Sequence, residues 1–328
     1  MTYDKMKSSP SKALIIAAFT AIYIIWGSTY LGIKYAIETI PPFFMAGIRF
    51  LITGIILIVW CILKKDKFPS NKFFGIIAFS GVLMMFVGNA GVGWVEQYLP
   101  IGIAAIVVAS LPLWFVALDK RQWQYNFSNK LIILGVLVGF SGILLLMLDK
   151  SSLNIADDPK KLIAFFVLLT GTICWAIGSL ISKYKKADGA TTARVGIQML
   201  AAGVVSMVAG FISKEHNGFE LTKISSTSLF ALLYLIVMGS LVAYLSYMWL
   251  LSVRSPSIVG TYAYVNPVVA VFLGWLMLDE VIGRNQVIAL CIILLGVVLV
   301  SMPKKESGQK STSRTRNLYM KVAKGTNP

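Results

Sequence analysis

The segment IYIIWGSTYLGIKYAIETIPPFFMAGIRFLITG, residues 22–54, has a counterpart later in the same chain, and this repeat sets the architecture. Sliding the sequence by 149 positions places the segment on residues 171–203, with nine identities in 33 positions and no gap. Trp26 meets Trp175 in this alignment. An offset of 155 then aligns Trp94 with Trp249, Ile103 with Ile258 and Pro112 with Pro267. The common order of the matches indicates two related halves in tandem.

Composition places both halves in a membrane. Of the 328 residues, 57% are hydrophobic and 13% are charged, about half the charged share of a soluble domain. The apolar residues come in runs of about 20, which is the length of a helix that crosses a bilayer. Helices are expected because a chain in lipid must bond its own backbone groups. The ten predicted spans are 13–35, 41–63, 72–94, 101–118, 130–148, 161–184, 191–212, 226–251, 257–278 and 284–302.

The sequence therefore predicts an all-α membrane protein of ten transmembrane helices, five in each half. The expected segments are a cytoplasmic N-terminus at 1–12, a first five-helix repeat at 13–148, a connecting loop at 149–160, a second five-helix repeat at 161–302 and a basic cytoplasmic tail at 303–328.

The distribution of basic residues predicts the orientation. A net charge of +16 would suggest a nucleic-acid partner for a soluble protein, but here the basic residues lie in short loops between apolar spans. The N-terminus, alternate loops and tail carry 22 of the 30 lysines and arginines, and the other loops carry seven. The positive-inside rule then places both termini in the cytoplasm. Because five is odd, the second half enters the membrane from the opposite side, an inverted repeat typical of transporters.

Short motifs in both halves resemble those of EamA domains. The motifs are WGSTYLGIK (26–34), PPFFMAGIRF (41–50), CWAIGS (174–179), YVNPV (264–268), LDE (278–280) and Gly296. In this respect the chain is similar, over about residues 13–302, to the ten-helix drug/metabolite exporter family of the drug/metabolite transporter superfamily. The resemblance implies alternating access through a central cavity faced by the first, third and fourth helices of each half. It implies export of amino acids, other metabolites or toxic compounds, without naming the substrate.

Polar and aromatic residues at helical spacing mark the surfaces that face the interior. Trp26 and Tyr30 lie four apart on the first span, and Tyr262 and Asn266 do so on the ninth. Such groups are unfavourable against lipid and are expected to line a cavity for an amphipathic organic solute. The predicted substrate-binding residues are Trp26, Tyr30, Asn89, Trp175, Ser179, Tyr244, Tyr247, Tyr262 and Asn266.

Four further residues receive other roles. Pro112 and Pro267 match across the repeat, and each is expected to kink its helix as a hinge or to expose backbone beside the solute, because proline lacks the amide donor. Arg49 is the one charge deep in a span. It is expected either to bond helix-end carbonyls, paired with Glu38 or Glu96, or to contact an anionic group of the solute. Glu96, at a span end, is the candidate coupling residue, because proton-coupled carriers commonly use a buried acid.

The leading hypothesis is an alternating-access exporter of amino acids or related metabolites in the cytoplasmic membrane. An importer or exchanger of sugars or nucleotide-linked sugars with the same fold is the alternative. It ranks lower because a phosphate carrier needs several inward basic residues and the chain offers mainly Arg49 and Lys34. A membrane-embedded lipid-modifying enzyme is disfavoured, since the sequence has no histidine pair, Ser-His arrangement or acidic pair within the spans. The expected partners are a small-molecule substrate and the lipid bilayer, with no cofactor, metal or nucleic acid, and the oligomeric state stays open.

Overall fold

The computed structural model describes residues 11–148, 155–185 and 187–301, and every regular element in these ranges is a helix. The expected tail at 303–328 and most of the N-terminal segment 1–12 lie outside the described residues. The first half contains α1 (Lys12–Ala36), α2 (Pro42–Lys64), α3 (Asn71–Gly81), η1 (Val82–Ala90), α4 (Gly91–Val95), α5 (Ile101–Val108), α6 (Leu111–Leu118), η2 (Lys120–Gln122), α7 (Trp123–Ser128) and α8 (Lys130–Met147). The second half contains α9 (Pro159–Tyr184), α10 (Thr191–Ile212), η3 (Leu221–Lys223), α11 (Ser226–Tyr234), η4 (Leu235–Tyr244), α12 (Leu245–Val253), α13 (Pro256–Val259), α14 (Tyr262–Leu278) and α15 (Arg284–Ser301).

These helices suit a bilayer. Eight helical segments of the described ranges are long and apolar enough to cross a membrane, and α14 and α15 supply two shorter apolar helices. Large apolar side chains on the outside, such as Leu63 at 75% and Ile212 at 76% exposed, would be a liability in water but face a compatible solvent in lipid. The protein is thus an all-helical membrane protein whose helical segments lie where the sequence predicts its spans.

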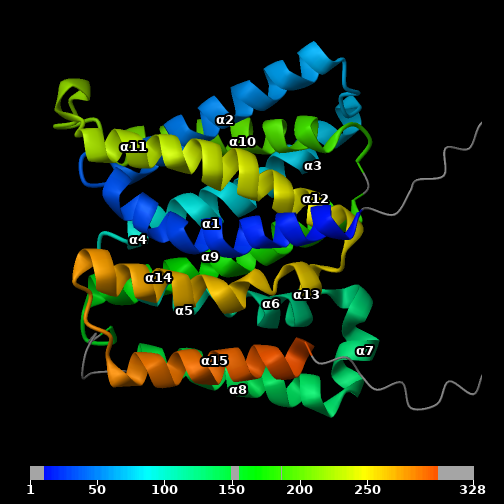
Figure 1. Ribbon diagram of the computed structural model, residues 1–328, viewed down its shortest axis with the longest axis vertical. Coiled ribbons are helices and arrows are strands. Elements are labelled where there is room, and N and C mark those ends of the chain that lie inside the picture. The colour runs from blue at the N-terminus through cyan, green and yellow to red at the C-terminus, as the bar shows by residue number, and fades with distance from the viewer. Residues whose placement is uncertain (1–10, 149–154, 186, 302–328) are drawn as a thin grey trace, which may run out of the picture.

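The helices lie side by side in a bundle (Figure 1). The helix pair α2 and α10 forms one edge of the bundle, and the pair α8 and α15 forms the opposite edge. Between these edges, α1 packs against α11, η4, α12 and α14, whereas α9 packs against η1, α4, α5 and α6. The first helix of each half therefore occupies the middle of the bundle.

The pair α8 and α15 is held by direct backbone contact. A Cβ atom added to Gly296 would lie 2.5 Å from the backbone nitrogen of Gly139 and 2.6 Å from the backbone oxygen of Gly135. Only glycine leaves room for two helices at this separation, and small residues play the same part in other membrane bundles. Gly135 and Gly139 thus form the contact surface of α8, and Gly296 is their partner on α15.

The interior contains four departures from regular α-helix. Residues of η1 and η4 form π-helical turns in the third helical segment of each half. The fourth segment of the first half is interrupted at Ala109 and Ser110, between α5 and α6, and its counterpart is interrupted at Gly260 and Thr261. Turns of the π type recur at functional sites in other proteins.

Two pairs of contacts recur at the offsets found in the sequence. Lys34 Nζ donates to the backbone oxygen of Glu96 at 2.7 Å, and Lys183 Nζ donates to that of Leu251 at 2.6 Å. Each lysine thus caps the carboxyl end of the third helical segment in its own half, where the helix dipole favours a cation. The matched positions differ by 149 and 155 residues, as in the sequence alignment.

A second pair ties the halves to each other. The N–H of Ser225, which begins α11, donates to Thr39 Oγ1 at 3.1 Å. The N–H of Ser70, which precedes α3, donates to Asp188 Oδ1 at 2.8 Å. Positions 39 and 188 match at the first offset and positions 70 and 225 at the second, so the two halves share their long-range contacts as well as their helices.

We expect Gly296→Ala to destabilise the protein, because its methyl group would meet the backbone of Gly135 and Gly139. Overpacking of this kind costs about 1–3 kcal/mol, and the thermal unfolding midpoint in detergent should fall. Gly75→Ala is the matched control, since a Cβ atom there meets nothing within 4 Å. Equal midpoints for the two variants would contradict the backbone contact.

Candidate functional site

A small cavity lies at the centre of the bundle, between α1, η1, α4, α5, α6, α9 and α14. Six of the nine predicted binding residues line it: Trp26, Tyr30, Asn89, Trp175, Tyr262 and Asn266. Its volume is about 50 Å³, which is room for a few water molecules. In this conformation the cavity must enlarge before an organic solute can enter.

Aromatic rings form one wall of the cavity. The ring of Trp26 lies 5.4 Å from that of Trp175 and 4.8 Å from that of Tyr262, both in edge-to-face geometry. Tyr247 packs behind them, 5.1 Å from Trp26 and 5.7 Å from Trp175. Pairs of this geometry stabilise a structure by about 0.5–1.5 kcal/mol beyond their buried area. We call Trp26, Trp175, Tyr244, Tyr247 and Tyr262 the aromatic cluster.

Hydrogen bonds fix these rings in place. Trp26 Nε1 donates to the backbone oxygen of Gly239 at 3.2 Å, and Trp175 Nε1 donates to the Tyr247 hydroxyl at 3.2 Å. The Tyr247 hydroxyl also lies 2.7 Å from Ser179 Oγ. Their polar edges are therefore satisfied within the protein. Ser179 and Tyr247 support the wall from behind and are not part of the lining.

Arg49 lies behind Asn89 and is buried, with 3% of its surface exposed. Its Nε donates to Ser240 Oγ at 2.8 Å, and its Nη1 donates to Asn89 Oδ1 at 3.0 Å. The carboxylate partners considered from sequence are thus replaced by two neutral acceptors. Gly239 makes space for the guanidinium, because a Cβ atom there would lie 2.9 Å from Nη2.

The bond from Arg49 fixes the amide of Asn89. A guanidinium only donates, so the oxygen of Asn89 must face it, and the amide nitrogen is left for the cavity. Asn266 has the opposite arrangement. In the amide orientation that its neighbours support, its nitrogen donates to the backbone oxygens of Tyr23 at 2.9 Å and Tyr262 at 3.1 Å. Its oxygen remains, so the cavity has one amide that donates and one that accepts.

The second half has a neutral version of the contact between Arg49 and Asn89. The Tyr244 hydroxyl donates to Gln198 Oε1 at 2.9 Å, and positions 198 and 244 match positions 49 and 89 at the two offsets. Gln198 Nε2 in turn donates to Ser80 Oγ and Ser182 Oγ. Tyr244 was predicted to bind substrate, but its hydroxyl is engaged outside the cavity and it does not line the space.

The two matched prolines have different settings. Pro267 lies inside α14, as expected of a helix kink. Pro112 is the second residue of α6, where a helix needs no amide donor, so the bend of this span lies at the preceding interruption.

Glu96 lies outside the cavity, at the carboxyl end of α4. None of its surface is exposed, and neither of its carboxyl oxygens has a hydrogen-bond partner among the described residues. Its backbone groups are bonded: the oxygen accepts from Lys34 Nζ, and the N–H donates to the oxygen of Val92. A buried carboxylate without donors is strongly disfavoured, so this environment suits the protonated form.

Other lining residues were missed from sequence. They are small or apolar: Thr29, Ile33, Gly88, Val92, Val108, Leu111, Gly171 and Thr172. Gly88 and Gly171 let η1 and α9 approach closely, since a Cβ atom on Gly171 would lie 2.9 Å from the backbone oxygen of Val87. In the sequence, Gly88 precedes Asn89 and Gly171 precedes Thr172, and these pairs could have indicated the missed lining residues.

Comparison with known proteins gives a consistent result. The chain matches the EamA-like transporter family over residues 12–148 and 162–302. It is 39% identical over 292 residues to a protein of Escherichia coli strain K12 named inner membrane transporter YedA, itself uncharacterized, and the match covers 88% of this chain and 91% of that protein. It is 26% identical over 284 residues to Protein PecM of Dickeya dadantii, over 84% and 88% of the two chains. One crystal structure shares the fold, with a TM-score of 0.61 and 16% identity over 88% of this chain and 97% of the other.

Replacement of Arg49 tests the polar contacts behind the cavity. Arg49→Gln should lower the free energy of unfolding by about 1.5–3 kcal/mol for each charged hydrogen bond that is lost. Thermal unfolding in detergent measures the change, with Arg254→Gln at an exposed helix end as the control. An Arg49→Gln midpoint equal to that of the control would show that the bonds to Ser240 and Asn89 contribute nothing to stability.

Proposed function

Because the chain belongs to the EamA-like transporter family, we propose that it is an alternating-access exporter of amino acids or related metabolites. The family makes it a multi-pass transporter of small solutes in the cytoplasmic membrane and not an enzyme. The observation that carries the narrower proposal is the pair of amides, one donating and one accepting, beside the aromatic cluster in a single cavity.

The two amides match the two ends of a zwitterion. The Asn89 amide nitrogen, polarised by Arg49, suits a carboxylate, because donors backed by a charge bond anions more strongly. The oxygen of Asn266 suits an ammonium group, which would also lie near the faces of Trp26 and Tyr262 and gain a cation–π interaction. The remaining apolar lining suits a hydrocarbon side chain. A sugar would also accept these amides, so sugars belong in the test.

The proposed topology is two inverted five-helix repeats with both termini in the cytoplasm. Ten helical segments, their related halves and the excess of basic residues in alternate loops support it. The contacts of Lys34 and Lys183 support it too, since they lie where α4 and α12 finish, at opposite ends of the bundle (Figure 1). In this topology Lys34 lies at the outer end and Lys183 at the cytoplasmic end.

The conformation supports an inward-facing assignment. At the outer end, Glu280 accepts from the backbone N–H groups of Ile101 at 2.7 Å and Gly102 at 3.3 Å, which ties α5 to the loop after α14. At the cytoplasmic end there are two pockets of about 790 and 560 Å³, both lined by Lys183. In alternating access the Glu280 contacts at the outer end would break and the pockets at the cytoplasmic end would close. Pro267 and the interruption before Pro112 are the proposed hinges for this movement.

Glu96 is the proposed coupling residue. Its carboxyl group is buried without a donor, with Lys34 and Glu280 as the nearest charged groups, so it is expected to hold a proton in this conformation. Opening of the outer end would admit water, so that Glu96 takes its proton from the outside, and this proton would be released to the cytoplasm in the inward-facing part of the cycle. Inward proton movement would then drive outward solute movement.

Counterflow in liposomes tests the transport proposal. We expect preloaded unlabelled amino acids to accelerate uptake of labelled ones by the purified protein. Asn89→Ala and Asn266→Ala should each lower the exchange rate by about tenfold or more, because a solute charge loses its hydrogen-bond partner. Ser141→Ala is the control, since this serine is exposed on α8. Exchange of sugars alone would replace the amino-acid proposal, and no exchange of either class would contradict it.

The role of Glu96 has its own measurement. Glu96→Gln should retain counterflow but lose the acceleration that a pH gradient gives the wild-type protein, because glutamine carries no exchangeable charge. Glu38→Gln, exposed near the same end, should respond to the gradient as the wild type does. A full response of Glu96→Gln would remove Glu96 from coupling.

A further inference from the structure

A basic pocket of about 560 Å³ lies between α3, α9, α10 and α12, apart from the central cavity. Its polar lining comprises Ser80, Ser182, Lys183, Lys185, Arg194, Gln198 and Ser252. We call it the Arg194 pocket. Three of its lining residues are cationic, and none of the described residues that line it is acidic. The proposed topology places this pocket at the cytoplasmic end.

The charge of Arg194 is not neutralised by the described part of the chain. Its Nη1 donates to the backbone oxygen of Ala187 at 3.0 Å, and its Nη2 donates to Thr191 Oγ1 at 2.9 Å. Both acceptors are neutral. Its Nε is buried and has no acceptor among the described residues. A buried charged donor in this state is destabilising, and an anionic oxygen beside the guanidinium would relieve it.

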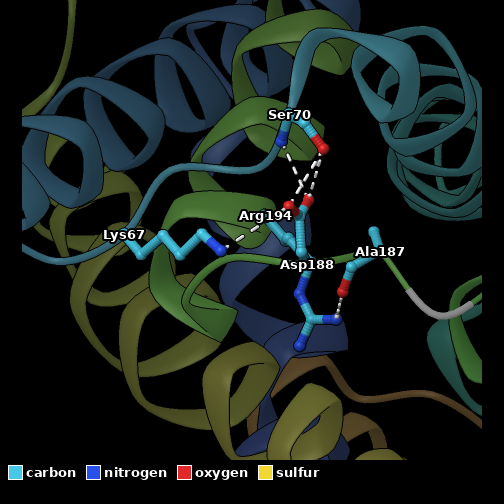
Figure 2. Close-up of polar contacts among 5 residues, drawn as sticks. All are labelled: Lys67, Ser70, Ala187, Asp188 and Arg194. Atoms are coloured by element: carbon cyan, nitrogen blue, oxygen red, sulfur yellow. Dashed lines mark hydrogen bonds and ion pairs between the residues drawn. The ribbon is translucent and has the colours of Figure 1, made fainter.

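The nearest carboxylate is committed elsewhere, as Figure 2 shows. Asp188 accepts from the backbone N–H of Ser70 at 2.8 Å and from its hydroxyl at 2.9 Å, and it forms an ion pair with Lys67 at 3.9 Å. These hydrogen bonds hold the pKa of the Asp188 carboxyl below its ordinary value. Asp188 therefore remains ionised and bound to its own partners, and it leaves Arg194 unpaired.

The three cations of the Arg194 pocket are not all present at the matching positions of the first half. At an offset of 149, Lys183 corresponds to Lys34, but Lys185 and Arg194 correspond to Ala36 and Met45. The matching place in the other half therefore lacks two of the three cations. A cationic pocket at one end only suggests a role in binding at that end, beyond the scaffold that both halves share.

A polar layer separates this pocket from the central cavity. Gln198, with 1% of its surface exposed, donates to Ser80 and Ser182 on the pocket side. On its other side it accepts from Tyr244, whose ring lies 6.3 Å from that of Trp175 in the cavity wall. The bond between Gln198 and Tyr244 therefore joins the lining of the pocket to the aromatic cluster.

We propose that the Arg194 pocket is a loading site that binds the carboxylate of an outgoing solute before the layer of Gln198 and Tyr244 opens. This inference rests on the proposed export function and names its substrate class: zwitterionic or anionic carboxylates, and not cationic amines. Arg194 and Lys185 supply the charge, and the bonds to Ala187 and Thr191 hold the guanidinium in position.

A thiol-protection experiment tests the site without requiring transport. In a chain with Cys61, Cys174 and Cys291 replaced by serine, Ser252→Cys places a thiol at an exposed position of the pocket lining. The measured quantity is the rate at which this thiol reacts with an anionic methanethiosulfonate reagent in the presence of phenylacetate, phenylalanine or phenylalaninamide. We expect the first two to slow the reaction saturably and the amide to have no effect.

Variants assign the protection to the basic residues. Arg194→Gln and the exposed Lys185→Gln should each weaken protection by phenylacetate, with about tenfold more ligand needed for Arg194→Gln, and Arg194→Lys should largely restore it. Gln97→Cys is the matched control at the opposite end, because positions 97 and 252 differ by 155. It should show no protection.

The outcomes separate this inference from the transport proposal. Protection without counterflow would support the carboxylate site and reject export. Counterflow without protection would overturn the site and leave export standing. Equal protection by phenylalaninamide, or protection unchanged in both Arg194→Gln and Lys185→Gln, would likewise overturn the site.

Discussion

A backbone in hydrocarbon must satisfy its own hydrogen bonds, and this constraint governs where the chain can depart from regular helix. The interruption at Ala109 and Ser110 is buried in the bundle, and the π turns of η1 and η4 each bury part of their residues there. There, side chains replace the missing backbone partners. Ser110, for example, donates to the oxygen of Val107 and accepts from Trp114. Two of these irregular segments carry Asn89 and Tyr244.

The fold was largely readable from the sequence because its signals are long and redundant. Apolar runs located the helical segments, and the offsets of 149 and 155 located the halves. The π turns were not predicted, because one extra residue in a turn leaves no mark on an apolar run. Nor could periodicity distinguish Pro112 at a helix start from Pro267 inside a helix.

The candidate site could be predicted only in part from the sequence. Residue spacing shows which face of a helix a side chain lies on, but it does not show whether that side chain lines the cavity or packs behind its wall. Trp26 and Trp175 were placed together through the repeat, and both line the cavity. Tyr247 packs against both of these rings but does not line the cavity. Arg49 was expected to bond helix-end carbonyls, a carboxylate or the solute, and its acceptors are instead the side-chain oxygens of Ser240 and Asn89. Equivalent positions of a duplicated scaffold have thus acquired different chemistry, a guanidinium in one half and the amide of Gln198 in the other.

The small central cavity has a bioenergetic consequence. A space of about 50 Å³ holds a few water molecules, which is too few to form a continuous file through the bundle, and the rings of Trp26, Trp175 and Tyr262 bound it. Protons cross membranes readily along such files of water. In this conformation the central cavity therefore gives protons no such file of water to follow.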